Sequence, residues 1–164
     1  MTGPPSCTFG IDVGSTTLKA VAVDDNGAIV ASLVEPTTPF IEDQSQRALQ
    51  VLRERCPLGG KGPIGATGYG RKRIPSATGV VTEITCHARG AFHLIRRPGV
   101  LIDFGGQDTK VIQIGDGGEV VDFTMNDKCA AGTGRFLEVI LGRLHVPLDE
   151  AAEMADRAER AVSV

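Results

Sequence analysis

The sequence predicts an α/β protein made of two copies of one unit, each a three-stranded meander followed by a helix, a strand and a second helix. Short apolar runs alternate with glycine-rich turns, and a segment near the start recurs 91 residues later. GIDVGSTTLKAVAVDDNGAIV, starting at Gly10, aligns without a gap with LIDFGGQDTKVIQIGDGGEVV, starting at Leu101. The identical pairs are Ile11 with Ile102, Asp12 with Asp103, Gly14 with Gly105, Lys19 with Lys110, Asp25 with Asp116, Gly27 with Gly118 and Val30 with Val121.

An internal duplication explains this alignment. Any two glycine-turned hairpins of an α/β protein also look somewhat alike. A hairpin alone, however, requires neither the shared aspartate nor the lysine at the same offset.

The elements of the first unit follow from apolar periodicity and turn residues. We expect strands over residues 8–13, 18–24, 28–34 and 64–67. A helix is expected over 43–55 with Asp43 as its N-cap, and a second over 82–95.

The second unit repeats the pattern with strands expected over 100–104, 109–114 and 119–124. Gly132, Thr133 and Gly134 open a predicted helix, another is expected over 149–160, and a strand begins within 161–164. We place the subdomains at 8–97 and 98–164. Counted from Leu101, the second repeat has only 64 residues, against 91 from Gly10 to the start of the second repeat, so we expect it to be incomplete, with an exposed sheet edge.

Composition indicates an ordinary soluble protein. The net charge of −3 and the apolar fraction of 41% do not favour binding to nucleic acid or to an anionic membrane. No leader or spanning segment is recognisable, and we expect a cytoplasmic location. Cys7, Cys56, Cys86 and Cys129 form no CxxC pair, so we expect reduced thiols and no disulfide framework.

Each repeat carries a loop suited to phosphate. In Gly14-Ser15-Thr16-Thr17, glycine lets backbone N–H groups approach an anion, and the hydroxyls add donors. Asp12, just before this loop, can act on phosphate through hydrated Mg²⁺, and Asp103 occupies the same position in the second copy. Ordinary turns use the same residue types, but the pair of loops favours a nucleotide. The Walker and Rossmann glycine patterns are absent from the sequence.

Five sequence blocks carry a more specific resemblance. They are GIDVGSTTLKAV, ATGYGR from Ala66, EITCHARGA from Glu83, DFGGQDTKVI and NDKCAAGTGRFLE from Asn126. In this order they resemble the BadF/BadG/BcrA/BcrD-type ATPases, which activate 2-hydroxyacyl-CoA dehydratases and include benzoyl-CoA reductase subunits. The resemblance implies an actin-like ATPase (ribonuclease H-like) fold of duplicated βββαβα units that closes on Mg-ATP.

The resemblance also implies roles for the loop residues. Asp12, Asp103 and Gln107 are expected to act in catalysis. The expected nucleotide-binding residues are Gly14, Ser15, Thr16, Thr17, Lys19, Gly105, Gly106 and Asp108.

Cys129 matches the family's first ligand to a [4Fe-4S] cluster shared across a homodimer. We expect it just before a helix whose free N–H groups favour a thiolate and can bond cluster sulfurs. The plainer alternative is a small buried apolar residue. The family's second cysteine lies beyond Val164, so this polypeptide alone is not expected to hold the cluster, and Cys7, Cys56 and Cys86 are interpreted as structural or incidental.

The function implied is an ATP-driven activator that passes a low-potential electron to a CoA-ester dehydratase or reductase, with reduced ferredoxin or flavodoxin as donor. The alternatives are a sugar or amino-sugar kinase of the same superfamily and a catalytically silent N-terminal fragment. Glu83 and His87, one helical turn apart, and the basic cluster Arg71–Arg73 are more simply read as solvated or structural.

Overall fold

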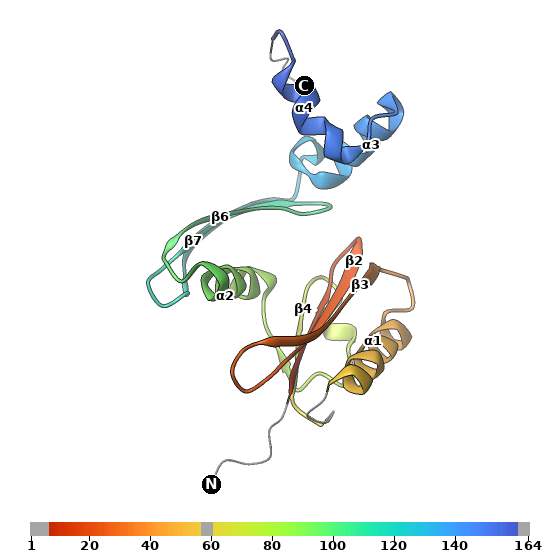
Figure 1. The fold of residues 1–164 in the computed structure, drawn as a ribbon, viewed down its shortest axis with the longest axis vertical. Helices are drawn as coiled ribbons and strands as arrows, with labels where there is room; N and C mark the ends of the chain where they lie inside the picture. The colour runs from red at the N-terminus through yellow and green to blue at the C-terminus, as the bar shows by residue number, and fades with distance from the viewer. Residues whose placement is uncertain (1–6, 57–60, 161–164) are drawn as a thin grey trace. The chain divides into compact units, whose positions relative to one another are not determined.

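The computed structural model describes residues 7–56 and 61–160. They fall into two compact units that divide between Gly90 and Ala91, hereafter the first and second unit. The chain passes from one to the other within helix α2 (Glu83–Ile95), and each unit is described by itself (Figure 1). Among the described residues, no helix combines the length and apolar character needed to cross a bilayer.

The first unit is a five-stranded mixed sheet in the order β3-β2-β1-β4-β5. Strand β1 pairs antiparallel with β2 and parallel with β4, while β5 continues the parallel side. The strands are β1 (Thr8–Val13), β2 (Thr17–Val23), β3 (Ile29–Pro36), β4 (Ile64–Thr67) and β5 (Gly79–Val80). All predicted strands are present, and β1 and β4 have the predicted bounds. The two-residue β5 was not predicted, because Gly79–Val80 is too short to show periodicity.

Alternation along the strands places the core on one face of this sheet. Phe9, Ile11 and Val13 of β1 are buried, and helix α1 (Ile41–Arg55) packs there through Leu49 and Leu52. This core fixes the position of the loop between β1 and β2.

Helix α1 begins at Ile41, so the prediction of Asp43 as its N-cap was wrong, and Phe40 occupies the cap position. The side chain of Gln44 explains why the helix begins earlier than predicted. Its buried amide accepts from Thr38 N at 2.8 Å and donates to Pro36 O at 2.8 Å, which ties the helix start to the end of β3. Asp43 instead lies in the first turn, where its charge favours the helix dipole.

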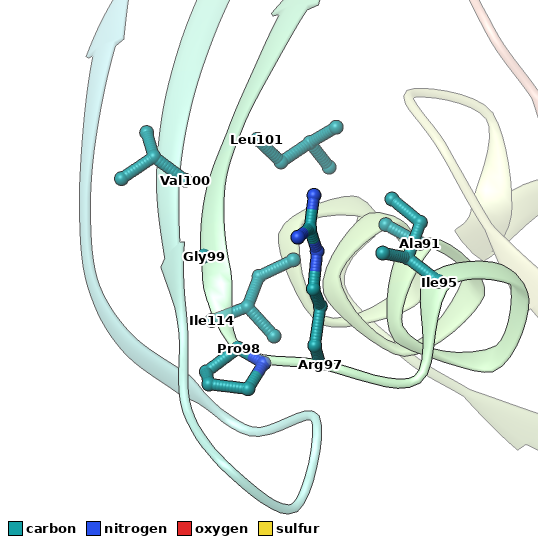
Figure 2. A pocket seen from close by; sticks show the side chains of 8 residues that line it. All are labelled: Ala91, Ile95, Arg97, Pro98, Gly99, Val100, Leu101 and Ile114. Carbon is teal, nitrogen blue, oxygen red and sulfur yellow. The ribbon is translucent and has the colours of Figure 1, made fainter.

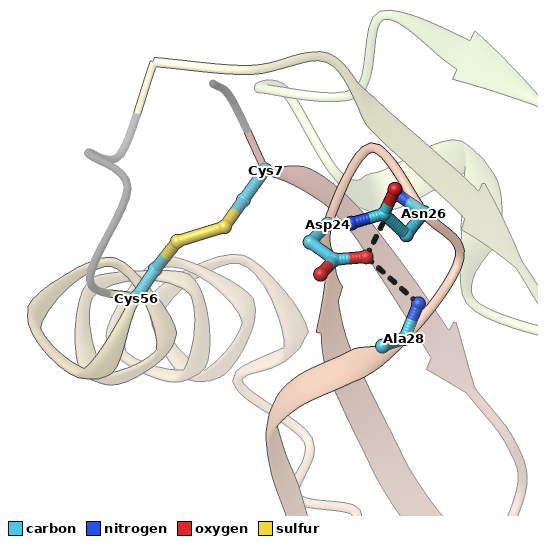
Figure 3. Close-up of a disulfide and its surroundings, with 5 residues drawn as sticks. All are labelled: Cys7, Asp24, Asn26, Ala28 and Cys56. Atoms are coloured by element: carbon cyan, nitrogen blue, oxygen red, sulfur yellow. Dashed lines mark hydrogen bonds between the residues drawn. A yellow bond between two sulfur atoms is a disulfide. The ribbon is translucent and has the colours of Figure 1, made fainter.

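Cys7 and Cys56 form a disulfide across 49 residues, which corrects the expectation of reduced thiols at these positions. Figure 3 shows the bond joining the start of β1 to the C-terminal end of α1, near the turn in which Asp24 accepts from Asn26 N and Ala28 N. Both cysteines are buried in the core of the first unit. The pairing has no local sequence signal, because the two residues meet only once β1 and α1 have packed.

The second unit reproduces the first meander residue by residue. Its strands β6 (Gly99–Phe104), β7 (Thr109–Ile114) and β8 (Val120–Asn126) form an antiparallel sheet in that order. Asp12 lies opposite Lys19 in β1-β2, and Asp103 lies opposite Lys110 in β6-β7. The register shift of the first sheet and that of the second also fall at equivalent positions, Ala22/Val23 and Gln113/Ile114. The shared register supports the inferred duplication.

The second sheet has large apolar side chains on its surface. Strand β6 exposes Val100, Ile102 and Phe104 by 67, 56 and 64%, and β8 exposes Phe123. Within the described part of the chain, β6 pairs only with β7. The strand predicted to begin within 161–164 lies outside the described residues.

After β8 the chain forms a short 3-10 turn, η2 (Ala130–Gly132), and the predicted helix α3 (Gly134–Leu144). A second 3-10 turn, η3 (Leu148–Glu150), precedes helix α4 (Ala151–Asp156). The expected helix over 149–160 was therefore too long at both ends.

Candidate functional site

The first of the two predicted phosphate loops, residues 14–17, connects β1 to β2 and is held in a tight turn. Gly14 N donates to Thr17 O at 3.0 Å, and Thr37 braces the turn by donating from its Oγ1 to Gly14 O at 2.9 Å. Ser15 and Thr16 at its tip are exposed. Two of the three hydroxyl residues predicted to bind phosphate are thus exposed, whereas Thr17 is half-buried.

Asp12 and Lys19 flank this loop as cross-strand partners. Lys19 Nζ lies 3.1 Å from Asp12 Oδ2, and their side chains are 49% and 24% exposed. Such an exposed pair is weakly held, so both charges remain available to a ligand.

A neighbouring loop packs closely on Asp12. Gly68 follows β4 with φ +84°, and a Cβ there would collide with Asp12 Oδ1 and approach Val13 O to 2.6 Å. Only glycine fits this position without strain. Arg71 is anchored through Nη1 to Gly68 O at 2.9 Å, and Arg73 lies 3.9 Å from Glu42, so two members of the basic cluster have partners within the chain.

The second predicted phosphate loop, residues 105–108, differs from the first in the burial and ion pairing of its lysine. Lys110 is buried and its Nζ lies 2.6 Å from Asp108 and 3.4 Å from Asp103. In the first loop, Thr17 occupies the position of Asp108 and Lys19 is exposed. The additional carboxylate compensates the buried ammonium, because a buried charge requires a partner.

Lys110 is therefore a residue of the candidate site that was not predicted from the sequence. The alignment contained a signal for this difference. Asp108 lies two residues before Lys110, whereas Thr17 lies two residues before Lys19. Gln107, predicted to be catalytic, is exposed at the loop tip, whereas Asp108 contacts the lysine.

The backbone of the second loop contacts the start of α3. Gly105 O accepts from Gly134 N at 2.9 Å, and Gly106 O accepts from Arg135 N at 3.3 Å. The Thr133 side chain caps the helix by accepting from Phe136 N at 3.4 Å. The first-turn N–H groups of α3 thus have acceptors, which corrects the expectation that they are free to bond cluster sulfurs.

Cys129 is a free, exposed thiol, so the alternative of a buried apolar residue is excluded. It precedes η2 directly, four residues before the Thr133 cap of α3. Its amide donates to Asn126 Oδ1 at 3.2 Å, an Asx-type turn that fixes the backbone at the end of β8.

The [4Fe-4S] cluster expected at Cys129 requires more ligands than the described residues bring together. Such a cluster takes four thiolates, whereas no group of three or more His, Cys, Asp or Glu side chains gathers to hold a metal in this part of the chain. The only other free cysteine among them, Cys86, lies in α2 of the first unit. The described residues alone therefore supply too few thiolates for a complete cluster.

A pocket of about 370 Å³ lies in the second unit, lined by residues of α2, β6 and β7 and of the segment between α2 and β6. Figure 2 shows the Arg97 side chain between Ala91 and Ile95 of α2 and Leu101 of β6. No residue of either phosphate loop lines it, and it contributes nothing to the candidate site.

Residues 9–164 match the sequence model of the BadF/BadG/BcrA/BcrD ATPase family. The chain belongs to this family. It is 46% identical to the activator of lactoyl-CoA dehydratase of Anaerotignum propionicum over 92% of this chain and 59% of that protein. It is 38% identical to the (R)-2-hydroxyglutaryl-CoA dehydratase activating ATPase of Acidaminococcus fermentans, over 96% of this chain and 61% of that protein. The chain thus spans about three fifths of these relatives.

Solved structures of dehydratase activators also resemble this chain. The crystal structure of component A of the A. fermentans (R)-2-hydroxyglutaryl-CoA dehydratase superposes with a TM-score of 0.83 at 36% identity, over 96% of this chain and 61% of that one. The activator of 2-hydroxyisocaproyl-CoA dehydratase from Clostridium difficile with bound ADPNP gives 0.82 at 35%, over 97% of this chain and 60% of that one. The predicted fold class, actin-like ATPase, is confirmed. The subdomain limits 8–97 and 98–164 remain predictions.

Proposed function

We propose that this chain supplies the phosphate-binding part of an ATP-dependent activator of a CoA-ester dehydratase or reductase. The observation that supports it most is the pair of equivalent loops, each with an aspartate opposite a lysine in the same register, in a chain of the BadF/BadG/BcrA/BcrD family. One solved relative binds ADPNP, and several curated relatives are named as dehydratase activators.

In this proposal Asp12 and Asp103 bind hydrated Mg²⁺, and the loops donate backbone and hydroxyl hydrogens to phosphate oxygens. Lys19 offers a mobile ammonium to phosphate, since its ion pair with Asp12 is exposed. Lys110 instead holds Asp103 and Asp108 in place, and Gln107 at the loop tip orients the attacking water.

Cys129 is proposed as one ligand of a [4Fe-4S] cluster; such a cluster, once its ligand set was complete, would supply low-potential electron transfer, with reduced ferredoxin or flavodoxin as donor and the partner enzyme as acceptor. Its exposure suits a ligand shared with a second copy of the chain in a homodimer. The remaining thiolates must come from polypeptide outside the described residues.

The nucleotide proposal is tested by calorimetric titration of Mg-ADPNP into the chain and into two variants. Asp103→Asn should weaken binding at least about tenfold, because it removes a carboxylate that acts through the metal. Asp122→Asn, an exposed change on the same sheet, should not alter the affinity. Absence of binding to the unaltered chain would refute the proposal.

The cluster proposal is tested by anaerobic reconstitution with iron and sulfide, followed by UV-visible and EPR spectra. A [4Fe-4S] signal that responds to nucleotide and disappears in Cys129→Ala would support the activator. Nucleotide binding with phosphorylation of a sugar, unaffected by Cys129→Ala, would instead identify a kinase.

A further inference from the structure

We propose that Thr37 and Gln44 are positioning residues of the first phosphate loop, which together present Ser15 N–H to a phosphate oxygen. The inference rests on the proposed function, because it requires the loop to bind nucleotide. Neither positioning residue belongs to the loop. Gln44 holds Thr37 in place, and Thr37 in turn fixes a carbonyl group of the loop.

Thr37, which directly follows β3, holds two carbonyl groups of the loop. Its Oγ1 donates to Gly14 O at 2.9 Å across a separation of 23 residues in the chain. Its backbone N–H donates to Thr16 O, also at 2.9 Å. The backbone bond extends the pairing of β2 with β3, whereas the bond to Gly14 depends on the hydroxyl group of one half-buried side chain.

The peptide plane between Gly14 and Ser15 gives the Ser15 N–H a defined direction. In a planar trans peptide, the C=O of one residue and the N–H of the next point in opposite directions. Since Gly14 O points at Thr37, Ser15 N–H points away from Thr37. Ser15 is exposed, and within the described part of the chain its N–H has no acceptor. A fixed, exposed amide of this kind is a donor for an anion.

The side chain of Gln44 in α1 fixes the backbone on both sides of Thr37. Its Oε1 accepts from Thr38 N at 2.8 Å and from Thr38 Oγ1 at 3.0 Å. Its Nε2 donates to Pro36 O at 2.8 Å and to Glu35 Oε1 at 2.7 Å. These bonds use both hydrogens and both lone pairs of the amide, which is buried. Because a buried and fully satisfied polar group makes its surroundings rigid, α1 holds Thr37 in position.

The second phosphate loop provides an internal reference. Gly105 O, the counterpart of Gly14 O, accepts from a backbone donor, Gly134 N, at 2.9 Å. A substitution of Thr37 does not remove this donor. We therefore expect changes at Thr37 to affect Ser15 N–H and not the amide of Gly106, which aligns with Ser15.

The first test measures the affinity for Mg-ADPNP by calorimetry. Thr37→Val keeps the shape of the side chain and the backbone N–H but removes the hydroxyl donor, whereas Thr37→Ser retains a hydroxyl. Thr37→Val should weaken binding about tenfold, because a hydrogen bond to a charged group contributes about this factor. Thr37→Ser should restore the affinity. Thr8→Val, the same replacement at an exposed residue of β1, should bind like the unaltered chain.

The second test follows the amide proton chemical shift of Ser15 by NMR, which a purely structural role of Thr37 would not alter selectively. In the unaltered chain, saturating Mg-ADPNP should move this resonance downfield, because the amide then donates to a phosphate oxygen. In saturated Thr37→Val the downfield change should largely disappear. The response of Gly106 should be the same in both proteins.

Gln44→Met tests the support of Thr37 by α1. Methionine fills a similar volume but cannot replace the four hydrogen bonds of the amide. It should weaken Mg-ADPNP binding by about the same factor as Thr37→Val, and the double variant should bind no more weakly than either single variant, because both act on the Gly14 carbonyl. Thermal melts establish that each variant is folded. If Gln44→Met does not fold, the Thr37 variants alone decide the role of the hydroxyl.

The outcomes separate this proposal from the proposed function. If Thr37→Val binds Mg-ADPNP as tightly as the unaltered chain, the positioning role is refuted and nucleotide binding stands. Equal weakening by Thr37→Ser, or an unchanged Ser15 response in Thr37→Val, would likewise overturn the positioning role. If the unaltered chain binds no nucleotide, the proposed function and the positioning role both fail.

Discussion

Replacing Lys110 and Lys19 separately by methionine tests whether the two phosphate loops differ electrostatically. Methionine keeps most of the apolar stem, so the change removes mainly the ammonium group. The Lys110 side chain is 4% exposed and forms ion pairs with Asp103 and Asp108, whereas that of Lys19 is 49% exposed and forms an ion pair with Asp12.

The expected magnitudes follow from these exposures. Removing one partner of a fully buried ion pair costs about 3–5 kcal/mol. Asp103 and Asp108 are 28% and 25% exposed, so solvent screens part of this cost, and we expect Lys110→Met to lose about 2 kcal/mol. For Lys19→Met the exposed pair predicts a loss below about 1 kcal/mol.

Hydrogen exchange read by mass spectrometry suits this comparison, because peptides from β2 and β7 report on each unit separately. A loss of 2 kcal/mol corresponds to exchange about 30 times faster in β7, while the β2 peptide of Lys19→Met should change less than about fivefold. Added salt should reduce the Lys19 effect more than that of Lys110. Equal effects of the two substitutions would refute the argument that burial distinguishes the loops.

Three other substitutions test features of the fold. Gly68→Ala should lower the free energy of unfolding by at least about 2 kcal/mol and weaken Mg-ADPNP binding, because its φ is +84° and its Cβ meets Asp12; thermal melts and calorimetry check this. Reduction of the Cys7–Cys56 disulfide should destabilise the chain by up to about 4 kcal/mol, because the unfolded chain gains loop entropy. The urea midpoint should therefore fall when reductant is added. In Cys56→Ser the midpoint should be equally low with and without reductant. Gly142→Ala should raise the melting temperature, since an open helix position gains about 1 kcal/mol from alanine; no change would mean that α3 unfolds separately from the measured transition.

The sequence was most informative where structure is local or repeated. Alternation placed β1, β4 and β7 at their observed bounds. The gapless alignment predicted that the two aspartates and the two lysines are equivalent, and the structure shows that each pair is cross-strand. These features depend on neighbours along the chain or across one turn.

It was least informative where distant segments meet. The start of α1 depends on Gln44 contacting β3, the disulfide depends on β1 packing beside α1, and the occupied N–H groups of α3 depend on the second loop. None of these has a signature within a short window. The burial of Lys110 could be predicted only in part. The sequence shows a second carboxylate, Asp108, near this lysine, but not how close the carboxylate lies to the ammonium group.

The apolar side chains along β6 affect how the isolated polypeptide should behave in solution. Within the described residues one edge of β6 has no strand beside it, and Val100, Ile102 and Phe104 of the same strand are exposed on one face. Such a strand is a template for intermolecular β-sheet, so self-association should rise steeply with protein concentration and temperature. A lysine at Ile102 would act as a gatekeeper against this assembly, and light scattering on that variant would distinguish strand-mediated aggregates from a dimer that forms around Cys129.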